Sequence, residues 1–245
     1  MKNKKNIFTI ILVIVFGLVF VPRIIDRLVN NDVSRSESRS LKLDNFEKNI
    51  DSLPYLIIND ERKKVPGFKF LNQNGELISN EFYFGKVYIV EFFFTTCTTI
   101  CPIMNTNLVH IQNSFTAFPN FGIASFSINP EYDTVNILSK YAKDNGIENP
   151  NWNLMTGEAD EIYELANDGF NLYTAASSDF IDGFEHSGYF ALVDKEGYIR
   201  CRQDEFGNPK IYYKGSVNFK EKLDLNGEAE EITVLKEDLL KLLNE

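Results

Sequence analysis

The pattern of apolar and polar positions along this chain predicts alternating strands and helices. Residues 87–94 are apolar at nearly every position and rich in β-branched and aromatic side chains, which is typical of a strand buried on both faces. A helix over 103–118 is indicated by apolar residues at helical spacing, at positions 104, 108, 111 and 115. A second strand is predicted at 122–128, followed by a helix that Asp133 and Thr134 can cap and that reaches about Lys143.

The remaining elements follow from turn residues and shorter patterns. Residues 68–79 form a predicted hairpin around Asn74-Gly75, and residues 189–202 form another around 195–197. The further elements expected are a strand at 152–155 and helices at 158–168 and 235–243. This order predicts an α/β domain whose mixed central sheet has helices on both faces and an N-terminal hairpin.

The N-terminal segment is different, because it is apolar without a polar face. Lys2, Lys4 and Lys5 precede an apolar run at 7–21, which approaches membrane-spanning length when it is extended across Arg23. We therefore predict a cytoplasmic tail at 1–6, a transmembrane signal anchor at 7–26, a polar tether at 27–52 and the folded domain at 53–245. The N-terminal lysines place the domain on the exported side of the membrane, in the periplasm or an equivalent extracytoplasmic space.

Two alternatives to the anchor stay open. A cleaved signal peptide has a similar charged start and apolar length, but the run ends in Val-Phe-Val-Pro-Arg, without the small residues of a cleavage site. A buried hydrophobic helix is the other alternative, and the missing polar face argues against it.

Composition narrows the possible chemistry. The 245 residues include 25 basic and 35 acidic side chains, a net charge of −10, which argues against a general nucleic-acid binder. The hydrophobic fraction of 44% is enough for a sizeable core, and the many Phe and Tyr residues are interpreted as part of it. Three cysteines and two histidines exclude a disulfide-rich scaffold, an all-cysteine zinc site and a His-rich metal cluster.

Cys97 and Cys101 lie where the predicted buried strand ends and the next helix begins. Ligands of α/β sheets bind at this edge, outside the carboxyl ends of the strands. If the turn is helical, a spacing of four residues places both sulfurs on one face, within reach of one metal ion or of each other. A helix N-terminus also favours thiolate, which both metal binding and disulfide exchange require. The alternative is a pair of buried, inert cysteines.

Three segments resemble the SCO/SenC family of membrane-tethered, thioredoxin-fold proteins. They are Glu91-Phe-Phe-Phe-Thr-Thr-Cys-Thr-Thr-Ile-Cys-Pro102, then 127–134, then His186-Ser187 with 190–197. The resemblance implies a site for one copper ion, Cu(I) or Cu(II), formed by Cys97, Cys101 and His186. It also implies delivery of copper to, or reduction of the cysteines of, the copper centre of cytochrome c oxidase.

The chain departs from the family pattern at two positions and over one segment. Thr98 follows the first cysteine where the family usually has proline, and Asn129 stands where the family has aspartate. The first change removes no proposed ligand, and the second puts in doubt a carboxylate role at position 129. Residues 205–232 match nothing in the family pattern.

His186 can also be assigned from the residues themselves. It lies in a polar, glycine-containing segment that we interpret as a loop before the strand at 189. The other histidine, His110, follows Cys101 by nine residues, which places it on the opposite side of the helix and predicts a solvated surface position. Cys201, on the second predicted hairpin, is expected to be half buried and structural.

Glu91 interrupts the apolar strand six residues before Cys97. On a covered face its pKa would rise, and it could move protons to and from a thiol. Alternatively, it pairs with a lysine or lies at an uncovered edge of the sheet.

Several functions remain open on this evidence. Two thiolates and one imidazole form a soft ligand set that favours copper, whereas zinc would need a fourth ligand from a carboxylate or water. The main alternative is a thiol-disulfide oxidoreductase that cycles a redox-active Cys97–Cys101 disulfide, although three residues rather than the usual two separate these cysteines. A peroxidase and a non-catalytic tethered interaction domain are further hypotheses.

Overall fold

The part of the chain that the structure describes covers most of the predicted domain. The computed structural model describes residues 42–43, 52–172, 174–176, 184–186, 188–204, 207–224 and 227–245, with the backbone alone for 42–43, 175–176 and 184–186. Within these ranges, no helix is both long enough and apolar enough to cross a membrane. The predicted tail, the signal anchor and most of the tether lie outside the described residues. All elements described below belong to the unit Leu41–Glu245.

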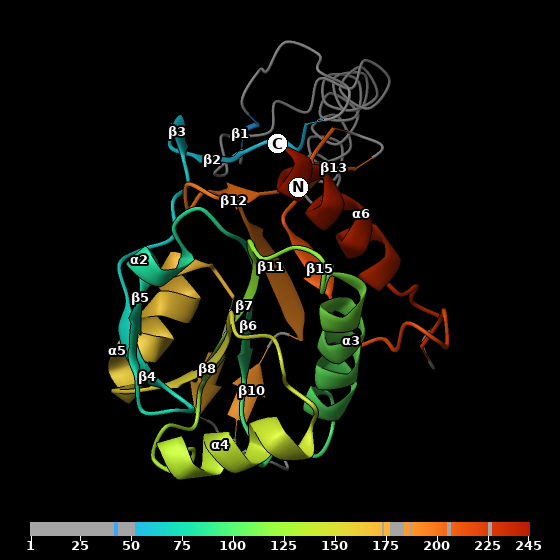
Figure 1. Ribbon diagram of the computed structural model, residues 1–245. Coiled ribbons are helices and arrows are strands. Elements are labelled where there is room, and N and C mark those ends of the chain that lie inside the picture. Colours follow the sequence, from blue (N-terminus) through green and yellow to red (C-terminus); the bar gives the residue numbers. More distant parts are fainter. Residues whose placement is uncertain are drawn as a thin grey trace, which may run out of the picture. The chain divides into compact units, whose positions relative to one another are not determined.

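An eight-stranded mixed sheet forms the centre of the domain (Figure 1). Its order is β12 (Ile199–Arg200), β11 (Tyr189–Val193), β6 (Val87–Phe93), β7 (Phe121–Ser127), β8 (Trp152–Thr156), β4 (Lys69–Asn72) and β5 (Leu77–Ser79), and β15 (Tyr212–Lys214) also pairs with β11. Strands β6, β7 and β8 are parallel, whereas β11 and β4 flank them in antiparallel orientation. The predicted mixed sheet is thus confirmed.

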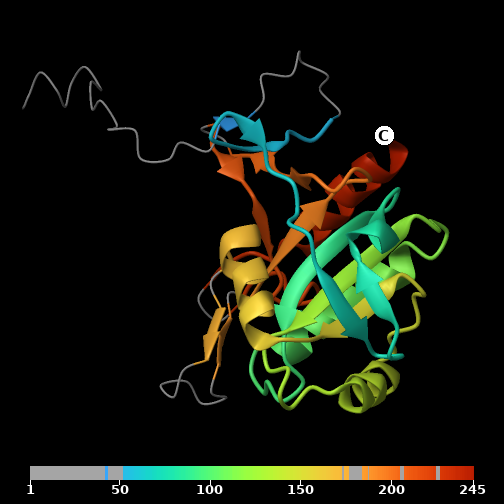
Figure 2. The same cartoon turned by 90° about the vertical axis from the view of Figure 1, so that its left-hand side faces the viewer.

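Helices cover both faces of this sheet, as predicted. Helix α3 (Cys101–Ser114) joins β6 to β7, and α4 (Val135–Asp144) joins β7 to β8. Right-handed crossovers place both connections on the same face. Helix α5 (Ala159–Glu164), which continues as the π-helix η1 (Leu165–Gly169), lies on the opposite side of the sheet from α4 (Figure 2).

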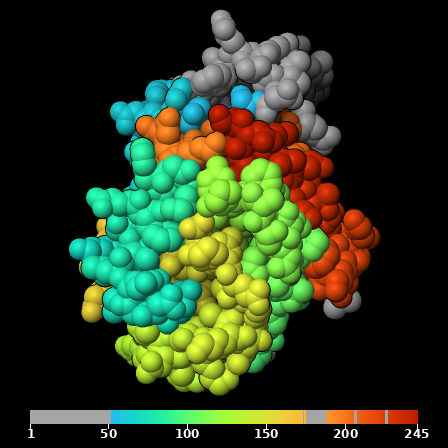
Figure 3. Space-filling model, viewed as in Figure 1, coloured from blue at the N-terminus to red at the C-terminus, as the bar shows by residue number. Residues whose placement is uncertain are grey.

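Shorter elements complete the described chain. They are α2 (Asn80–Tyr83), the three-stranded sheet of β1 (Lys42–Leu43), β2 (Leu56–Ile58) and β3 (Glu61–Arg62), the pair β9 (Thr174–Ala176) and β10 (Phe184–His186), the pair β13 (Arg202–Gln203) and β14 (Pro209–Lys210), and α6 (Ile232–Asn244). The predicted N-terminal hairpin is the β4–β5 pair, and Gly75 in its turn has φ of 76°, a conformation that glycine adopts readily. The space-filling view shows this hairpin, α3 and α4 together on one face of the domain (Figure 3).

The core lies on both sides of the three parallel strands. Every residue of β6, β7 and β8 is buried, which explains why their sequences lack polar alternation. One side is filled by packed aromatic rings, among which the Phe126 ring lies 5.1 Å from that of Phe68 and 5.4 Å from that of Phe92. Most of the aromatic residues that the structure describes therefore belong to the core, as expected, although Phe84 and Tyr132 are exposed.

The segment at 205–232, for which the sequence predicted no element, adds a strand to the sheet. Strand β15 pairs with β11, and Asn107 of α3 holds the residues that follow it. The Asn107 side-chain amide donates hydrogen bonds to the carbonyls of Gly215 and Val217, both at 2.8 Å. This segment therefore packs against the helix that begins at Cys101.

Candidate metal and thiol site

The cysteine pair lies in and just after the turn between β6 and α3. Strand β6 ends at Phe93, and α3 begins at Cys101, with Pro102 in its first turn. Cys97 is outside the helix, so the condition of a helical turn, under which the two cysteines would share one helix face, is not met. A spacing of four residues is equally compatible with a turn that closes onto a helix N-terminus, which is the arrangement found here.

The backbone at the start of α3 contacts the sulfur of Cys97. The Cys101 N–H lies 3.4 Å from Cys97 Sγ, and Thr99 Oγ1 lies 3.6 Å from the same sulfur. Both cysteines are buried, with 6% of Cys97 and 2% of Cys101 exposed, and both are thiols. An amide donor at a helix N-terminus stabilises negative charge, so this geometry favours thiolate at Cys97.

The second thiol is held in the protonated form. The pKa of Cys101 is raised well above its usual value, first by its hydrogen bond with the Cys97 side chain and then by burial and by the charge on Cys97. The charge on Glu91 raises this pKa further. The pair is therefore asymmetric, because negative charge is favoured at Cys97 while Cys101 retains its proton.

Glu91 lies on the covered face that the sequence suggested. It is 4% exposed on the central strand β6, so the alternative of an uncovered edge is wrong. The Ser125 hydroxyl donates to Glu91 Oε1 at 2.6 Å, and Trp152 Nε1 donates to the Ser125 oxygen at 2.9 Å. Burial raises the pKa of Tyr141 on α4, and the charges of Glu91, the two cysteines and Asp133 raise it further. These acidic groups therefore share one region under α4.

Asp133 is a residue of this region that the sequence reasoning misassigned. It was expected to cap α4, but α4 is capped at Thr134 without a side-chain hydrogen bond. Instead, the carboxylate of Asp133 accepts hydrogen bonds from the backbone N–H and the hydroxyl of Thr95, two residues before Cys97. The only sequence signal was its place in the 127–134 segment, which resembles the family pattern.

His186 lies in a short strand rather than in the loop expected from the sequence. In β10 it pairs with Thr174 of β9, and its side chain lies outside what the structure describes. Two residues later, Gly188 has φ of 67°, and a Cβ at that position would lie 2.9 Å from Ile100 Cδ1. The chain that follows His186 therefore packs directly against the residue before Cys101.

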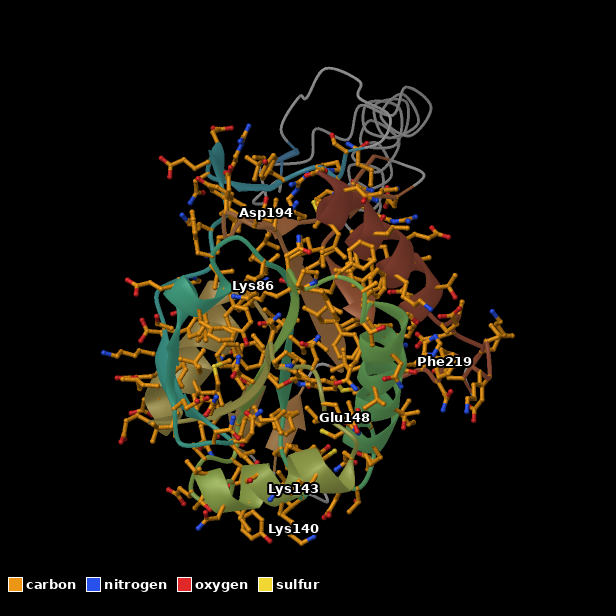
Figure 4. All side chains as sticks on the ribbon, in the orientation of Figure 1. Lys86, Lys140, Lys143, Glu148, Asp194 and Phe219 are labelled. Carbon is orange, nitrogen blue, oxygen red and sulfur yellow. The ribbon has the colours of Figure 1, made fainter. Side chains whose placement is uncertain are left out.

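The other histidine is half buried rather than solvated, contrary to expectation. The His110 ring stacks on Phe219, with 3.8 Å between ring centroids, and Nε2 lies 3.1 Å from Lys236 Nζ. Figure 4 labels Phe219 beside α3. Burial lowers the pKa of His110, and the charges of Lys236 and Lys220 lower it further. His110 is therefore a neutral packing residue on the flank of α3.

Cys201 is more deeply buried than expected and has structural surroundings. It is fully buried, and its sulfur lies 3.8 Å from the carbonyl oxygen of Pro54. Desolvation raises its pKa to about 12. This thiol is therefore held in the protonated, unreactive form.

The described side chains supply sulfur donors but no complete metal-binding set. Among them, no group of three or more His, Cys, Asp or Glu residues is arranged to hold a metal ion. Cys97 and Cys101 provide two adjacent sulfurs, which fit a soft ion such as copper. The ligand set of Cys97, Cys101 and His186 therefore stays a prediction.

Comparison with known proteins identifies the class of this domain. It is similar to a SCO1/SenC family lipoprotein from Bacillus anthracis, with a TM-score of 0.61 and 24% identity over 74% of this chain and 95% of that one. It is also similar to BsSco, a Sco family cytochrome c oxidase assembly protein in which a disulfide switch has been identified. That match has a TM-score of 0.57 and 27% identity over 74% of this chain and 94% of that one. The mixed sheet with its helices is thus the fold of a thioredoxin-like Sco domain.

Sequence comparison agrees with the fold. The SCO1/SenC family model matches residues 58–216, and the chain therefore belongs to the SCO1/SenC family. The SCO1 protein homolog of Bacillus subtilis is 33% identical over 138 residues, which span 56% of this chain and 71% of that protein. A SCO2-like protein of Rickettsia prowazekii is 30% identical over 149 residues, which span 57% and 69% of the two chains. The family resemblance drawn from three short segments is confirmed. The family match extends to residue 216, so the expectation that 205–232 lies outside the family pattern is wrong for residues 205–216.

Proposed function

We propose that this domain binds one copper ion through Cys97, Cys101 and His186, and that it serves the copper centre of cytochrome c oxidase. It either delivers copper to that centre or maintains its thiols. The observation that carries the proposal is the Cys97 sulfur held against the Cys101 N–H at 3.4 Å, in a chain of the SCO1/SenC family. The similarity to BsSco, a cytochrome c oxidase assembly protein, supports the choice of partner.

The chemistry of the donor atoms supports copper as the cargo. Thiolates are soft ligands that select Cu(I), and an added imidazole also suits Cu(II). ScoI of Arabidopsis thaliana, which shares this fold with a TM-score of 0.53 and 20% identity, has been crystallised with copper bound. That likeness concerns the fold, so the choice of copper for this chain rests on the sulfur donors.

His186 is proposed as the third ligand on the basis of where its backbone lies. The close approach of Gly188 to Ile100 ties the segment after His186 to the turn that carries the cysteines. The His110 ring, by contrast, stacks on Phe219 and contacts Lys236 through Nε2. His186 is therefore the better candidate of the two histidines.

A second function, thiol-disulfide exchange, is favoured by the asymmetry of the two thiols. In this reaction the Cys97 thiolate attacks a disulfide of the partner, forming a mixed disulfide and releasing one partner thiolate. Cys101 then loses its proton and attacks the Cys97 sulfur, which releases the second partner thiolate. The partner gains two electrons, and the Cys97–Cys101 pair becomes a disulfide. Glu91 is proposed to take up the Cys101 proton, since its charge acts on the pKa of that thiol.

We further propose that residues 7–26 anchor the chain in a membrane with the domain on the exported side. The lysines before this segment and its apolar composition support the anchor and its orientation. The compartment would allow the cysteine pair to cycle between dithiol and disulfide.

Anaerobic copper titration tests the ligand assignment. The full chain in detergent is compared with His186→Ala and with the matched control His110→Ala, by absorption and electron paramagnetic resonance. We expect one copper per chain with a sulfur-to-Cu(II) charge-transfer band, which His186→Ala loses and His110→Ala keeps. A His186→Ala chain with unchanged copper affinity and spectrum would show that the assignment is wrong.

The same variants separate the two functions. Thiol-disulfide exchange needs only the cysteines, so we expect His186→Ala to retain the formation and reduction of the Cys97–Cys101 disulfide. A wild-type chain whose cysteines cannot be cycled with a dithiol and its disulfide would eliminate the exchange function.

A further inference from the structure

Asp133 connects the ends of two neighbouring strands beneath the cysteine turn. Its carboxylate is fully buried and accepts from three donors on two other segments. Oδ2 accepts from the Thr95 N–H at 3.0 Å and from the Ser127 hydroxyl at 2.5 Å, and Oδ1 accepts from the Thr95 hydroxyl. Thr95 follows β6 and Ser127 ends β7, so one side chain links both strand ends.

The linked residue lies directly before the turn that places the thiols. The Cys97 N–H donates to the carbonyl of Phe94 at 3.3 Å, which closes the turn around Thr95. The Cys101 N–H then meets the Cys97 sulfur at 3.4 Å. A displacement of Thr95 would shift Cys97 and weaken this contact, because a hydrogen bond depends on the distance and angle between its partners.

Asp133 does not act as a helix cap, which is the role that its position in the sequence suggested. Helix α4 begins after Thr134, and its N-cap makes no side-chain hydrogen bond, so the carboxylate is not used as a helix cap. Phe93 and Ser127 are already paired in the sheet ladder, so the Asp133 carboxylate is not needed to pair the strands. The carboxylate adds hydrogen bonds to Thr95, which lies beyond Phe93 and Ser127, the last residue pair of the two strands.

We propose that Asp133 is a positioning residue for the thiol pair: it fixes Thr95 so that Cys97 Sγ faces the Cys101 amide at the start of α3. The inference rests on the proposed function only in taking Cys97 and Cys101 as the working pair. Asp133 does not touch the sulfurs, and it acts through the shape of the turn. Without its carboxylate, three donors in this region lose their shared acceptor and the turn loses its attachment to β7.

The test measures the reactivity of Cys97 separately from the stability of the domain. The full chain is reacted with iodoacetamide at neutral pH, and peptide mapping gives the alkylation rate at Cys97. We expect Asp133→Ala to slow this reaction about tenfold, which corresponds to the loss of one hydrogen bond to a thiolate. Asp133→Asn keeps an oxygen acceptor of the same shape, so it should recover much of the rate.

Asp238 provides a matched control. It is also a fully buried carboxylate, and it accepts from the Tyr213 hydroxyl at 2.8 Å and from Arg202 rather than from the cysteine segment. We expect Asp238→Ala to lower the melting temperature while the Cys97 alkylation rate stays at the wild-type value. A wild-type rate in Asp133→Ala, or an equal slowing in Asp238→Ala, would overturn the proposal.

A milder variant keeps the test decisive if Asp133→Ala does not fold. Thr95→Val removes one donor and leaves the Asp133 carboxylate in place, so it should slow Cys97 alkylation by a smaller factor in the same direction. An unchanged rate in a folded Thr95→Val chain would count against the proposal. Copper titration separates this inference from the proposed function, because a chain that binds no copper still reports the reactivity of Cys97.

Discussion

The cysteine pair and Cys201 differ in the polarity of their partners rather than in burial. All three cysteines are buried, but the Cys97 sulfur faces an N–H donor, whereas the Cys201 sulfur faces the carbonyl oxygen of Pro54. A donor favours thiolate, and an acceptor favours the protonated thiol. The comparison teaches that burial keeps Cys201 protonated, whereas a backbone N–H aimed at the equally buried sulfur of Cys97 favours its thiolate.

The region of the cysteine pair and the region of Cys201 also differ in how their buried charged groups are held. Near the pair, buried carboxylates are held by uncharged hydroxyl and backbone donors, as at Glu91 and Asp133. Next to Cys201, Arg200 is buried between Asp194 and Glu245, with 3.0 Å from its Nη1 to each carboxylate, and its Nε donates to the Leu53 carbonyl at 3.0 Å. Figure 4 labels Asp194, on the turn beyond β11. We interpret the Cys201 region as the one that supports stability.

The largest expected difference is in thiol reactivity. At pH 8, we expect native Cys97 to be alkylated roughly a thousandfold faster than Cys201, because a pKa of about 12 leaves Cys201 almost no thiolate. Timed iodoacetamide labelling with peptide mapping measures both rates in one sample. The unfolded chain is the control, in which the rates should converge, and comparable rates in the native protein would contradict the comparison.

Removal of Arg200 should affect stability strongly and Cys97 little. Arg200→Ala leaves Asp194 buried without its ion pair, which we expect to lower the free energy of unfolding by about 3–5 kcal/mol. Urea denaturation measures the change, with Lys140→Ala in the exposed Lys140–Asp144 pair as a control of small effect. If Arg200→Ala slowed Cys97 alkylation in the folded protein, the two regions would not be separable.

Ser125 connects Glu91 to Trp152, and its loss should have an intermediate effect. Ser125→Ala removes two buried hydrogen bonds, so we expect the free energy of unfolding to fall by about 1–3 kcal/mol. Trp152 is the single tryptophan of the chain, and its emission should change as Nε1 loses its partner. Ser114→Ala, which removes an exposed hydrogen bond to the His110 carbonyl, should alter neither stability nor emission appreciably.

The smallest expected effect is on how the free energy of unfolding depends on pH in alkaline solution. The pKa of Cys201 rises from 9.0 to about 12 on folding, so between these values the folded chain keeps a proton that the unfolded chain releases. Stability from this group is therefore complete below pH 9 and is lost as the pH rises toward 12. Cys201→Ser should show a flatter decline in urea denaturation between pH 8.5 and 10.5, and an identical slope would contradict the assigned pKa.

The main elements of the sheet were predictable because their signals are local. The continuous apolar run of β6 and the spaced apolar residues of α3 arise from burial of whole faces, which leaves a pattern in neighbouring positions. Strand β15 was not predicted, because three residues are too few to show a period and its burial depends on β11. The same limit applies to β13 and β14, which have two residues each.

The candidate site was located by the sequence but not resolved in detail. Residues Cys97 and Cys101 were identified from their place between a strand and a helix, and that junction is confirmed. The role of Asp133 could not be predicted, since its partner Thr95 is 38 residues away and the local pattern suggested a helix cap. His110 was misjudged for a similar reason, because Phe219 comes from a distant segment.

The sequence by itself determined the fold class, the family and the position of the thiol pair. These depend on periodicity, turn residues and short motifs, all of which are properties of neighbouring positions. Only the tertiary structure decided which sulfur faces a donor, which carboxylates are buried beside the pair and which cysteine is inert. Hydrogen bonds and desolvation depend on groups that folding brings together from separate segments, and a linear pattern does not record them.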